Sequence, residues 1–239
     1  MMRWVYAALL ALTAFALPAS AQTFNAQEQA EIRAIVREYL INNPDVLREA
    51  QDALAERRQS ELWRRAQSDP RDFSVGPADA PIVIVEFFDY RCGFCHAALE
   101  WVSDISRTRR DVRIVLKEFP ILSAESMEAS RAAIAAMPQG RYWQFHRALM
   151  SFRGDLTTAR IDQIARESGI DVARMRRAMA SEDVTRLLQD NRQLAIDLEN
   201  TATPLFLING ELVAGYDREL LETRLREATR EARQRSAQR

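Results

Sequence analysis

Two cysteines stand two residues apart in the run Cys92-Gly93-Phe94-Cys95-His96. They are the only cysteines in a chain of 239 residues, which is too few for a scaffold held together by disulfides. At this spacing one thiolate can attack a disulfide, and the second thiol can resolve the mixed disulfide that forms. The pair therefore indicates thiol–disulfide exchange.

The predicted helix that contains the pair makes the two cysteines unequal. The pattern predicts a helix from about Cys92 to Arg107, whose apolar face carries Cys95, Leu99, Val102 and Ile105. Cys95 should thus point inward, whereas Cys92 lies at the helix N-terminus, where unpaired amides stabilise a thiolate. We expect Cys92 to be the nucleophile and Cys95 the resolving thiol.

Other chemistries fit the same five residues. C-x-x-C-H is also the attachment motif of a c-type haem, for which His146 or a methionine could supply the second axial ligand. A zinc site would crowd both cysteines and His96 into one turn. A purely structural disulfide would close too small a loop to constrain the unfolded chain. A buried strand before the motif and a late hairpin favour the redox pair, so we expect no metal and no cofactor.

The surrounding pattern predicts an α/β domain. A buried strand should run over residues 82 to 88 and a second over residues 112 to 119, followed by helical patterns only, from about 123 to 199. Residues 205 to 208 and 212 to 214 flank an Asn-Gly turn, which is a hairpin signal. A final helix is expected from Asp217 to about Arg233.

Glu86 interrupts an otherwise apolar strand six residues before Cys92. A buried acid there should have a raised pKa and lie close enough to Cys95 to accept or deliver its proton. The alternative is a glutamate at a sheet edge that faces water. Lys117 is the only lysine among 33 basic residues and ends the neighbouring strand pattern. We therefore expect it to be the partner of Glu86.

The first residues predict export. Arg3 precedes an uncharged run from Trp4 to Leu17, and Ala19-Ser20-Ala21 matches a cleavage site, so residues 1 to 21 are expected to be a signal peptide. A membrane anchor is the alternative, but the run is shorter than the ~20 residues that span a bilayer. The expected compartment is oxidising, most simply a bacterial periplasm.

Residues 22 to 68 predict two helices separated by a break at Asn43-Pro44. Each carries a narrow apolar face, the first with Ile32, Ile35, Val36, Tyr39 and Leu40. Because such faces cannot close a core alone, we expect self-association of this segment in preference to docking on the same chain. Residues 69 to 81 are rich in proline and glycine and are expected to be a linker before the main domain, residues 82 to 239.

At this point the chain resembles the DsbA-type branch of the thioredoxin fold, over residues 72 to 235. The specific marks are Glu86-Phe87-Phe88, the Cys-Gly-Phe-Cys centre, and Thr203-Pro204 directly before the late strand. The resemblance implies a thioredoxin fold with an inserted helical domain, preceded by the N-terminal helical segment. It also implies a catalytic acid at Glu86 and a cis Pro204 against the redox pair, where Thr203 receives the substrate backbone.

Departures from DsbA itself bear on the reaction. DsbA has Pro-His between its cysteines and valine before the cis-proline, where this chain has Gly93-Phe94 and Thr203. These features resemble the DsbC and DsbG isomerases and the ScsC and Com1-like proteins, and ScsC-type relatives carry an N-terminal segment that oligomerises them. An isomerase or reductase is therefore expected, with a DsbA-like oxidase as the alternative. Gly93, Phe94, Lys117 and His96, the last as a nearby cation, are expected to tune the pair.

The net charge of −1 gives no reason to expect a nucleic-acid partner. The resemblance implies cysteine-containing secreted proteins as substrates and a DsbD-like or DsbB-like membrane protein as redox partner. A homo-oligomer formed through residues 22 to 68 completes the expected partners.

Overall fold

The computed structural model describes residues 24 to 238 of the chain, so the predicted signal peptide lies outside the described residues. The chain divides into two compact units, one ending at Ala53 and the other beginning at Leu54. The second unit contains the sheet and the cysteine pair. Within the described residues, no helix combines the length and apolar character needed to cross a bilayer.

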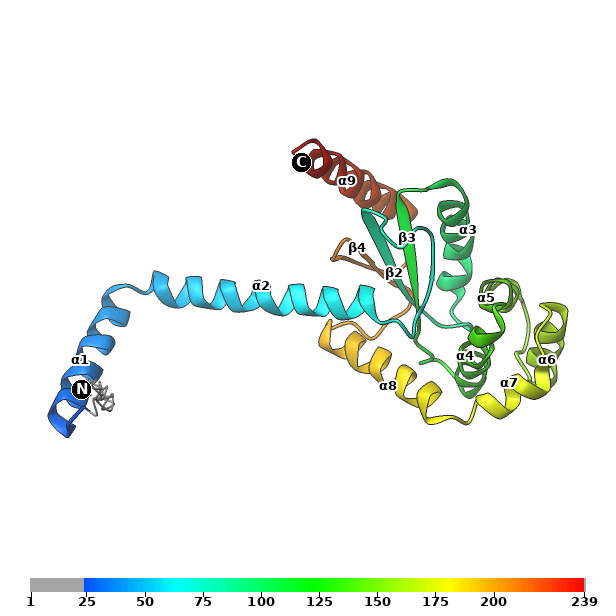
Figure 1. Ribbon diagram of the computed structural model, residues 1–239, viewed down its shortest axis with the longest axis horizontal. Helices are drawn as coiled ribbons and strands as arrows, with labels where there is room; N and C mark the ends of the chain where they lie inside the picture. Colours follow the sequence, from blue (N-terminus) through cyan, green and yellow to red (C-terminus); the bar gives the residue numbers. More distant parts are fainter. Residues whose placement is uncertain (1–23, 239) are drawn as a thin grey trace, which may run out of the picture. The chain divides into compact units, whose positions relative to one another are not determined.

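The second unit is built on one five-stranded sheet (Figure 1). Its strands are β1 (Phe73–Val75), β2 (Ile82–Phe88), β3 (Val112–Glu118), β4 (Leu205–Ile208) and β5 (Glu211–Ala214). The strand order is β1-β3-β2-β4-β5. The central β2 and β3 run parallel, whereas β1, β4 and β5 pair antiparallel with their neighbours. The predicted strands and the hairpin are confirmed.

Alternate residues of β2 and β3 enter two separate apolar cores. Ile84 and Ile114 pack with α3 (Gly93–Thr108) and α9 (Arg218–Ala237), whereas Val85 and Val115 pack on the opposite face with Leu194. Both faces are therefore covered, which explains why these strands carry continuous apolar runs.

The helical insertion follows β3 (green to yellow in Figure 1). It comprises α4 (Ala124–Ala136), the short 3-10 helix η1 (Met137–Gln139), α5 (Tyr142–Ser151), α6 (Thr158–Glu167), α7 (Val172–Ala178) and α8 (Glu182–Asp197). Side chains of the N-cap residues accept a backbone hydrogen bond at the starts of four of these helices, namely Ser123, Thr157, Asp171 and Ser181. The five-stranded sheet, with these helices inserted between β3 and β4, forms the expected thioredoxin fold with an inserted helical domain.

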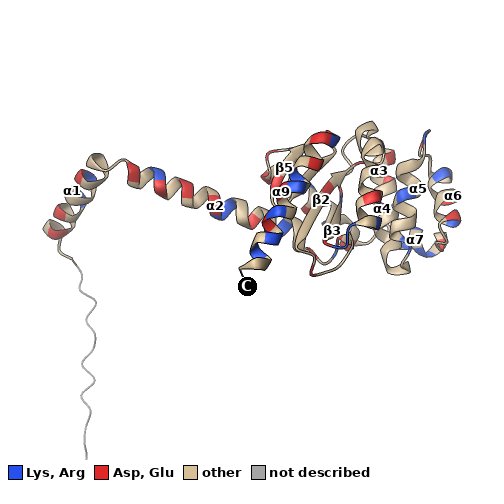
Figure 2. Ribbon diagram, turned by 90° about the horizontal axis from the view of Figure 1, so that it is seen from above, with Lys and Arg blue, Asp and Glu red and all other residues tan. Residues whose placement is uncertain are grey.

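The first unit contains α1 (Ala26–Asn42) and the start of α2 (Asp45–Ser68). Asn25 and Glu28 form the capping box that begins α1. No residue of α1 is buried, and Ile35 is 66% exposed. The other large exposed apolar side chains of this unit are Phe24, Ile32, Val36, Tyr39, Ile41 and Leu47. Charged residues of both signs occur along both helices (Figure 2).

Two boundaries differ from the sequence prediction. The expected linker contains β1, which pairs with β3, and its Phe73 stacks on Tyr142 with ring centroids 4.4 Å apart. The last turns of α2 belong to the second unit, because Ala66 is fully buried in the core that β2 and β3 form with Leu194. Trp63 packs beside it, against the β4–β5 turn. The end of the 22 to 68 segment thus docks on its own chain.

Candidate active site

Cys92 is the N-cap residue of α3, and Cys95 lies in the first turn, fully buried. The pKa of Cys92 is lowered to about 5, because the Cys95 thiol, the Thr203 side chain and the backbone amides of Cys95 and Phe94 hydrogen-bond to its sulfur. Burial, a hydrogen bond with Cys92 and the charge of Glu86 raise the pKa of Cys95. The two thiols are therefore unequal in the expected sense.

Glu86 lies in the middle of β2, a central strand, and is only 3% exposed. Burial, followed by the charge of Cys92, raises the pKa of Glu86 to about 8. The predicted buried acid is confirmed, and the alternative of a sheet-edge glutamate is wrong. A carboxyl with this pKa can gain or lose a proton near neutral pH.

Thr203 and Pro204 lie directly before β4, and the peptide bond between them is cis. The carbonyl oxygen of Thr203 lies 3.2 Å from the sulfur of Cys92 and accepts a hydrogen bond from the protonated thiol. Residues 111 positions apart thus meet at one sulfur atom. The cis peptide bond that the resemblance implies is present, and Thr203 contacts the redox pair.

The family model for a DSBA-like thioredoxin domain matches residues 83 to 226, which is more than half of the chain. The chain belongs to the DSBA-like thioredoxin family. A second model, the copper resistance protein ScsC N-terminal domain, matches residues 28 to 61. This second match covers the larger parts of α1 and α2.

Solved structures and curated proteins resemble this DSBA-like chain to different extents. A thioredoxin-like oxidoreductase from Silicibacter pomeroyi is 34% identical, with 72% of this chain and 97% of that one covered and a TM-score of 0.67. A linker-deletion mutant of Proteus mirabilis ScsC is 26% identical, with 89% and 100% covered and a TM-score of 0.67. A Na(+)/H(+) antiporter NhaA from Salinispora tropica is 32% identical over 168 residues, but the match spans only 26% of the antiporter.

Lys117 does not pair with Glu86 in this DSBA-like domain, and that prediction is wrong. Glu86 aligns with Leu116 across the β2–β3 pair, so Lys117 points to the opposite face of the sheet. Its ammonium group instead forms an ion pair with Asp72, and both side chains are 1% exposed. Burial raises the pKa of Asp72 to about 6, although the charge of Lys117 opposes the rise. The partner comes from the segment expected to be a linker.

Replacing Lys117 with methionine is expected to lower the free energy of unfolding by about 3 to 5 kcal/mol, because Asp72 would keep a buried charge without its cation. The ionisation of Cys92 should not change. The double variant Lys117→Met/Asp72→Leu, which removes both charges, should recover most of the loss. Urea unfolding of the three proteins measures both effects. If Lys117→Met keeps its stability but changes the titration of the Cys92 thiol, the result would support the tuning role that the sequence predicted for Lys117.

The two residues between the cysteines are exposed, whereas His96, directly after the pair, is half-buried. A Cβ at Gly93 would meet nothing within 4 Å, and Phe94 is 66% exposed. His96 lies 2.7 Å from the carbonyl oxygen of Tyr90 through Nε2, and burial lowers its pKa. His96 is therefore neutral at neutral pH, in contrast to the nearby cation expected from the sequence. Its contact joins the first turn of α3 to the residues before Cys92.

A buried polar network beside the pair was missed by sequence reasoning. Tyr90 and Tyr142 donate hydrogen bonds of 2.9 and 2.7 Å to Glu118 Oε1, and His146 Nδ1 lies 3.2 Å from the Tyr90 hydroxyl. Burial raises the pKa of Glu118 to about 8 and lowers that of His146 to about 3. His146, considered above as a haem ligand, is thus a neutral core residue. The sequence carried one signal for this network, because Glu118 is an acidic residue at the end of a buried strand.

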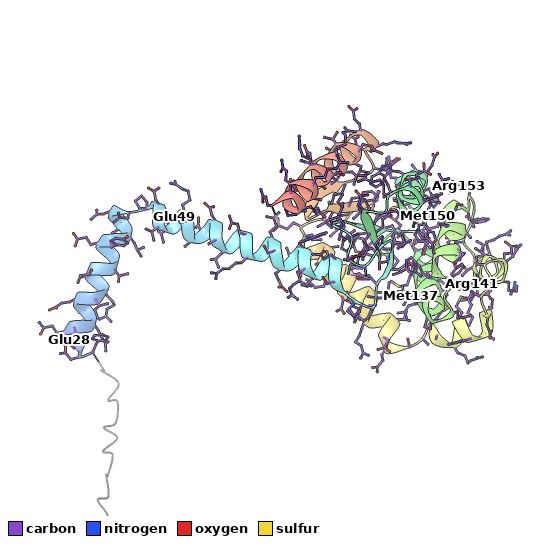
Figure 3. All side chains as sticks on the ribbon, turned by 45° about the horizontal axis from the view of Figure 1, so that its top comes forward. Glu28, Glu49, Met137, Arg141, Met150 and Arg153 are labelled. Carbon is purple, nitrogen blue, oxygen red and sulfur yellow. The ribbon has the colours of Figure 1, made fainter. Side chains whose placement is uncertain are left out.

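Helix α5 supplies Tyr142 and His146 to this network. Arg141 and Met150, labelled in Figure 3, mark its two ends. Arg153, just beyond α5, is a positive charge that helps to lower the pKa of His96. The helical insertion therefore forms part of the surroundings of the redox pair.

Proposed function

We propose that this protein is a periplasmic thiol–disulfide oxidoreductase that acts on protein disulfides, mainly as an isomerase or reductase. The observation that carries the proposal is the acidic Cys92 thiol, whose sulfur faces the Thr203 carbonyl beside the buried Cys95. A thiolate present at neutral pH is the attacking species in disulfide exchange. The thioredoxin-like oxidoreductase relative supports the same class of reaction.

The reaction begins when the Cys92 thiolate attacks one sulfur of a substrate disulfide. The Cys92–substrate bond forms, the substrate S–S bond breaks, and the other substrate sulfur leaves as a thiolate. In isomerisation, a substrate thiolate then attacks the mixed disulfide and frees Cys92 with no net oxidation. In reduction, Cys95 attacks Cys92, the substrate leaves with two added electrons, and the Cys92–Cys95 disulfide remains.

Glu86 links the two steps. The negative charge of the Cys92 thiolate raises the pKa of both Glu86 and Cys95. That charge disappears when the mixed disulfide forms, so both pKa values fall at the moment when Cys95 must lose its proton. Glu86, buried in β2, is the group proposed to accept it.

Oxidation of substrate thiols is the second candidate function. Stabilisation of the Cys92 thiolate, with a pKa of about 5, favours the reduced form of the enzyme and makes its disulfide a stronger oxidant. The Gly93-Phe94 dipeptide and Thr203 support the isomerase instead, through the resemblance to ScsC-type proteins. A DsbD-like membrane partner would keep the pair reduced, and a DsbB-like partner would keep it oxidised.

The N-terminal helices are proposed to assemble several copies of the chain through the exposed apolar face of α1. Ile35, Val36 and Tyr39 are at least half exposed within their own unit. A second copy would bury this face, and it would bring several Cys92 sites to one substrate at a raised effective concentration. Residues 1 to 21 support a periplasmic location for the assembly.

The full mature chain is expected to assemble and to reactivate scrambled ribonuclease. Ile35→Glu should produce monomers and lower reactivation about fivefold or more, because the sites act separately, while insulin reduction per site stays unchanged. Ala34→Glu is the matched control, since Ala34 is exposed and lies about half a helical turn from the apolar face. Light scattering measures the assembly. A wild-type monomer with full isomerase activity contradicts the assembly, and failure to exchange any disulfide contradicts the function.

The state of the pair in cells separates the two candidate reactions. Thiol trapping after export should find Cys92 and Cys95 reduced if the protein is an isomerase or reductase, and oxidised if it is an oxidase. A coloured protein with a haem absorption band would instead support the c-type haem alternative.

A further inference from the structure

Asp89 begins the turn that joins β2 to α3, and it is fully buried. Its carboxylate accepts four hydrogen bonds of 2.6 to 2.9 Å. Oδ1 receives the Ser126 hydroxyl and the Arg91 amide, and Oδ2 receives the amides of Ile121 and Leu122. One carboxylate thus joins the turn to the loop after β3 and to the first turn of α4.

The main chain of the same residue contacts both cysteines. The carbonyl oxygen of Asp89 accepts a hydrogen bond from the Cys92 amide at 3.1 Å. The backbone of Asp89 also hydrogen-bonds to the sulfur of Cys95, an interaction that favours the thiolate of that residue. The backbone of Asp89 therefore contacts both cysteines.

All four groups that contact the carboxylate are hydrogen-bond donors, two to each oxygen. The carboxylate therefore acts only as an acceptor, and its lone pairs are fully used. Hydrogen bonds to an ionised acceptor are stronger than neutral ones, and a buried amide left without an acceptor is costly. The turn directly before Cys92 is consequently held by a carboxylate with four hydrogen bonds.

We propose that Asp89 is a positioning residue, whose carboxylate fixes the turn so that the Cys92 sulfur meets the amides of the first turn of α3. The inference rests on the proposed redox role of the cysteine pair. Asp89 does not touch the substrate, and it acts through the geometry that it imposes on Cys92.

Positioning and simple electrostatics predict opposite signs for one substitution. Asp89→Asn keeps the shape of the side chain but removes its negative charge. Loss of a nearby negative charge alone makes a thiolate easier to form. Loss of the turn geometry weakens the hydrogen bonds to the Cys92 sulfur and makes the thiolate harder to form. A purely structural residue would change the stability of the fold but leave thiol ionisation in the folded protein unaltered.

The test is an ultraviolet titration of the Cys92 thiolate in the full-length reduced protein. For Asp89→Asn we expect the ionised fraction near pH 5 to fall about fivefold, which corresponds to a rise of about one pKa unit. An unchanged or larger ionised fraction overturns the proposal. Ser126→Ala removes one of the four hydrogen bonds with a minimal change of shape. Ser126→Ala should lower the ionised fraction of Cys92 near pH 5 about twofold. If Asp89→Asn fails to fold, the titration of Ser126→Ala tests the positioning role.

Asp162→Asn is the matched control, because Asp162 bonds Arg176 in the helical insertion. It should reduce stability without moving the thiol titration. Failure of this inference is distinguishable from failure of the proposed function. If wild-type Cys92 shows no acidic thiol and exchanges no disulfide, the function fails. The other case is a wild-type protein that shows an acidic Cys92 thiol and exchanges disulfides, while Cys92 of Asp89→Asn ionises to the same extent. In that case only the positioning role of Asp89 fails.

Discussion

Replacement of Cys92 with serine is expected to lower the rate of disulfide exchange by about a thousandfold or more, because the variant loses its nucleophile. Cys95 should not take over the attack, since it is fully buried and its pKa is raised, whereas that of Cys92 is lowered to about 5. Insulin reduction in the presence of dithiothreitol measures the loss.

Cys95→Ser is the matched control for this prediction, because it removes the other thiol of the same pair. Cys92 keeps its hydrogen bonds to Thr203 and to the α3 amides, so the first attack should persist. Resolution cannot follow, and mixed disulfides with substrates should accumulate on non-reducing gels. If Cys95→Ser also lost the attack, and Cys92→Ser formed the adducts instead, the roles assigned to the two cysteines would be reversed.

Replacement of Glu86 with glutamine is expected to slow the resolution step about a hundredfold, the effect typical of losing a general base. Cys95 is buried beside this acid, and water has little access to accept its proton. The first attack by Cys92 should be almost unchanged. Stopped-flow measurement of the release of a model mixed disulfide separates the steps, and equal slowing of both would exclude a specific role in resolution.

The same variant is expected to change how stability depends on pH. The folded-state pKa of Glu86 is about 8 against an ordinary value of 4.5, so between these values the folded protein holds a proton that the unfolded chain has lost. The contribution of Glu86 to stability is thus greatest below the ordinary value and declines as pH rises, by about 1.4 kcal/mol per pH unit. Glu86→Gln removes this dependence.

Urea unfolding at several pH values between about 5 and 7.5 tests the sign. The stability of Glu86→Gln relative to the wild type should increase steadily over this range. Glu100→Gln provides the control, because Glu100 is exposed on α3 and its replacement should give a constant difference. A constant difference for Glu86→Gln as well would mean that the buried carboxyl is not protonated in the folded protein.

The central elements of the site could be predicted because their signals are local. Two cysteines within one helical turn, an acid in an apolar strand and a proline before a late strand are each recognisable from neighbouring residues. The partner of Lys117 could not be predicted in the same way. Strand register decides which face a side chain enters, and a shift of one residue moves it to the other face.

Long-range contacts account for the remaining differences. Strand β1 has only three residues among proline and glycine, too few for a periodic pattern, and it exists because β3 offers an edge and Tyr142 a stacking surface. The partners of Glu118 lie 28 and 24 residues from it along the chain. In the sequence, Asp89 resembles an ordinary turn residue. The four groups that donate hydrogen bonds to its carboxylate come together only in the folded chain.

The turn between β4 and β5 has a consequence for how this sequence can evolve. Gly210 has a φ of +97°, and a Cβ there would lie 3.4 Å from the ring of Trp63. That distance is an ordinary van der Waals contact, so the ring does not exclude a side chain, whereas the positive φ strongly favours glycine. Divergence at position 210 is therefore restricted by the backbone of the hairpin, whichever residue α2 carries at position 63.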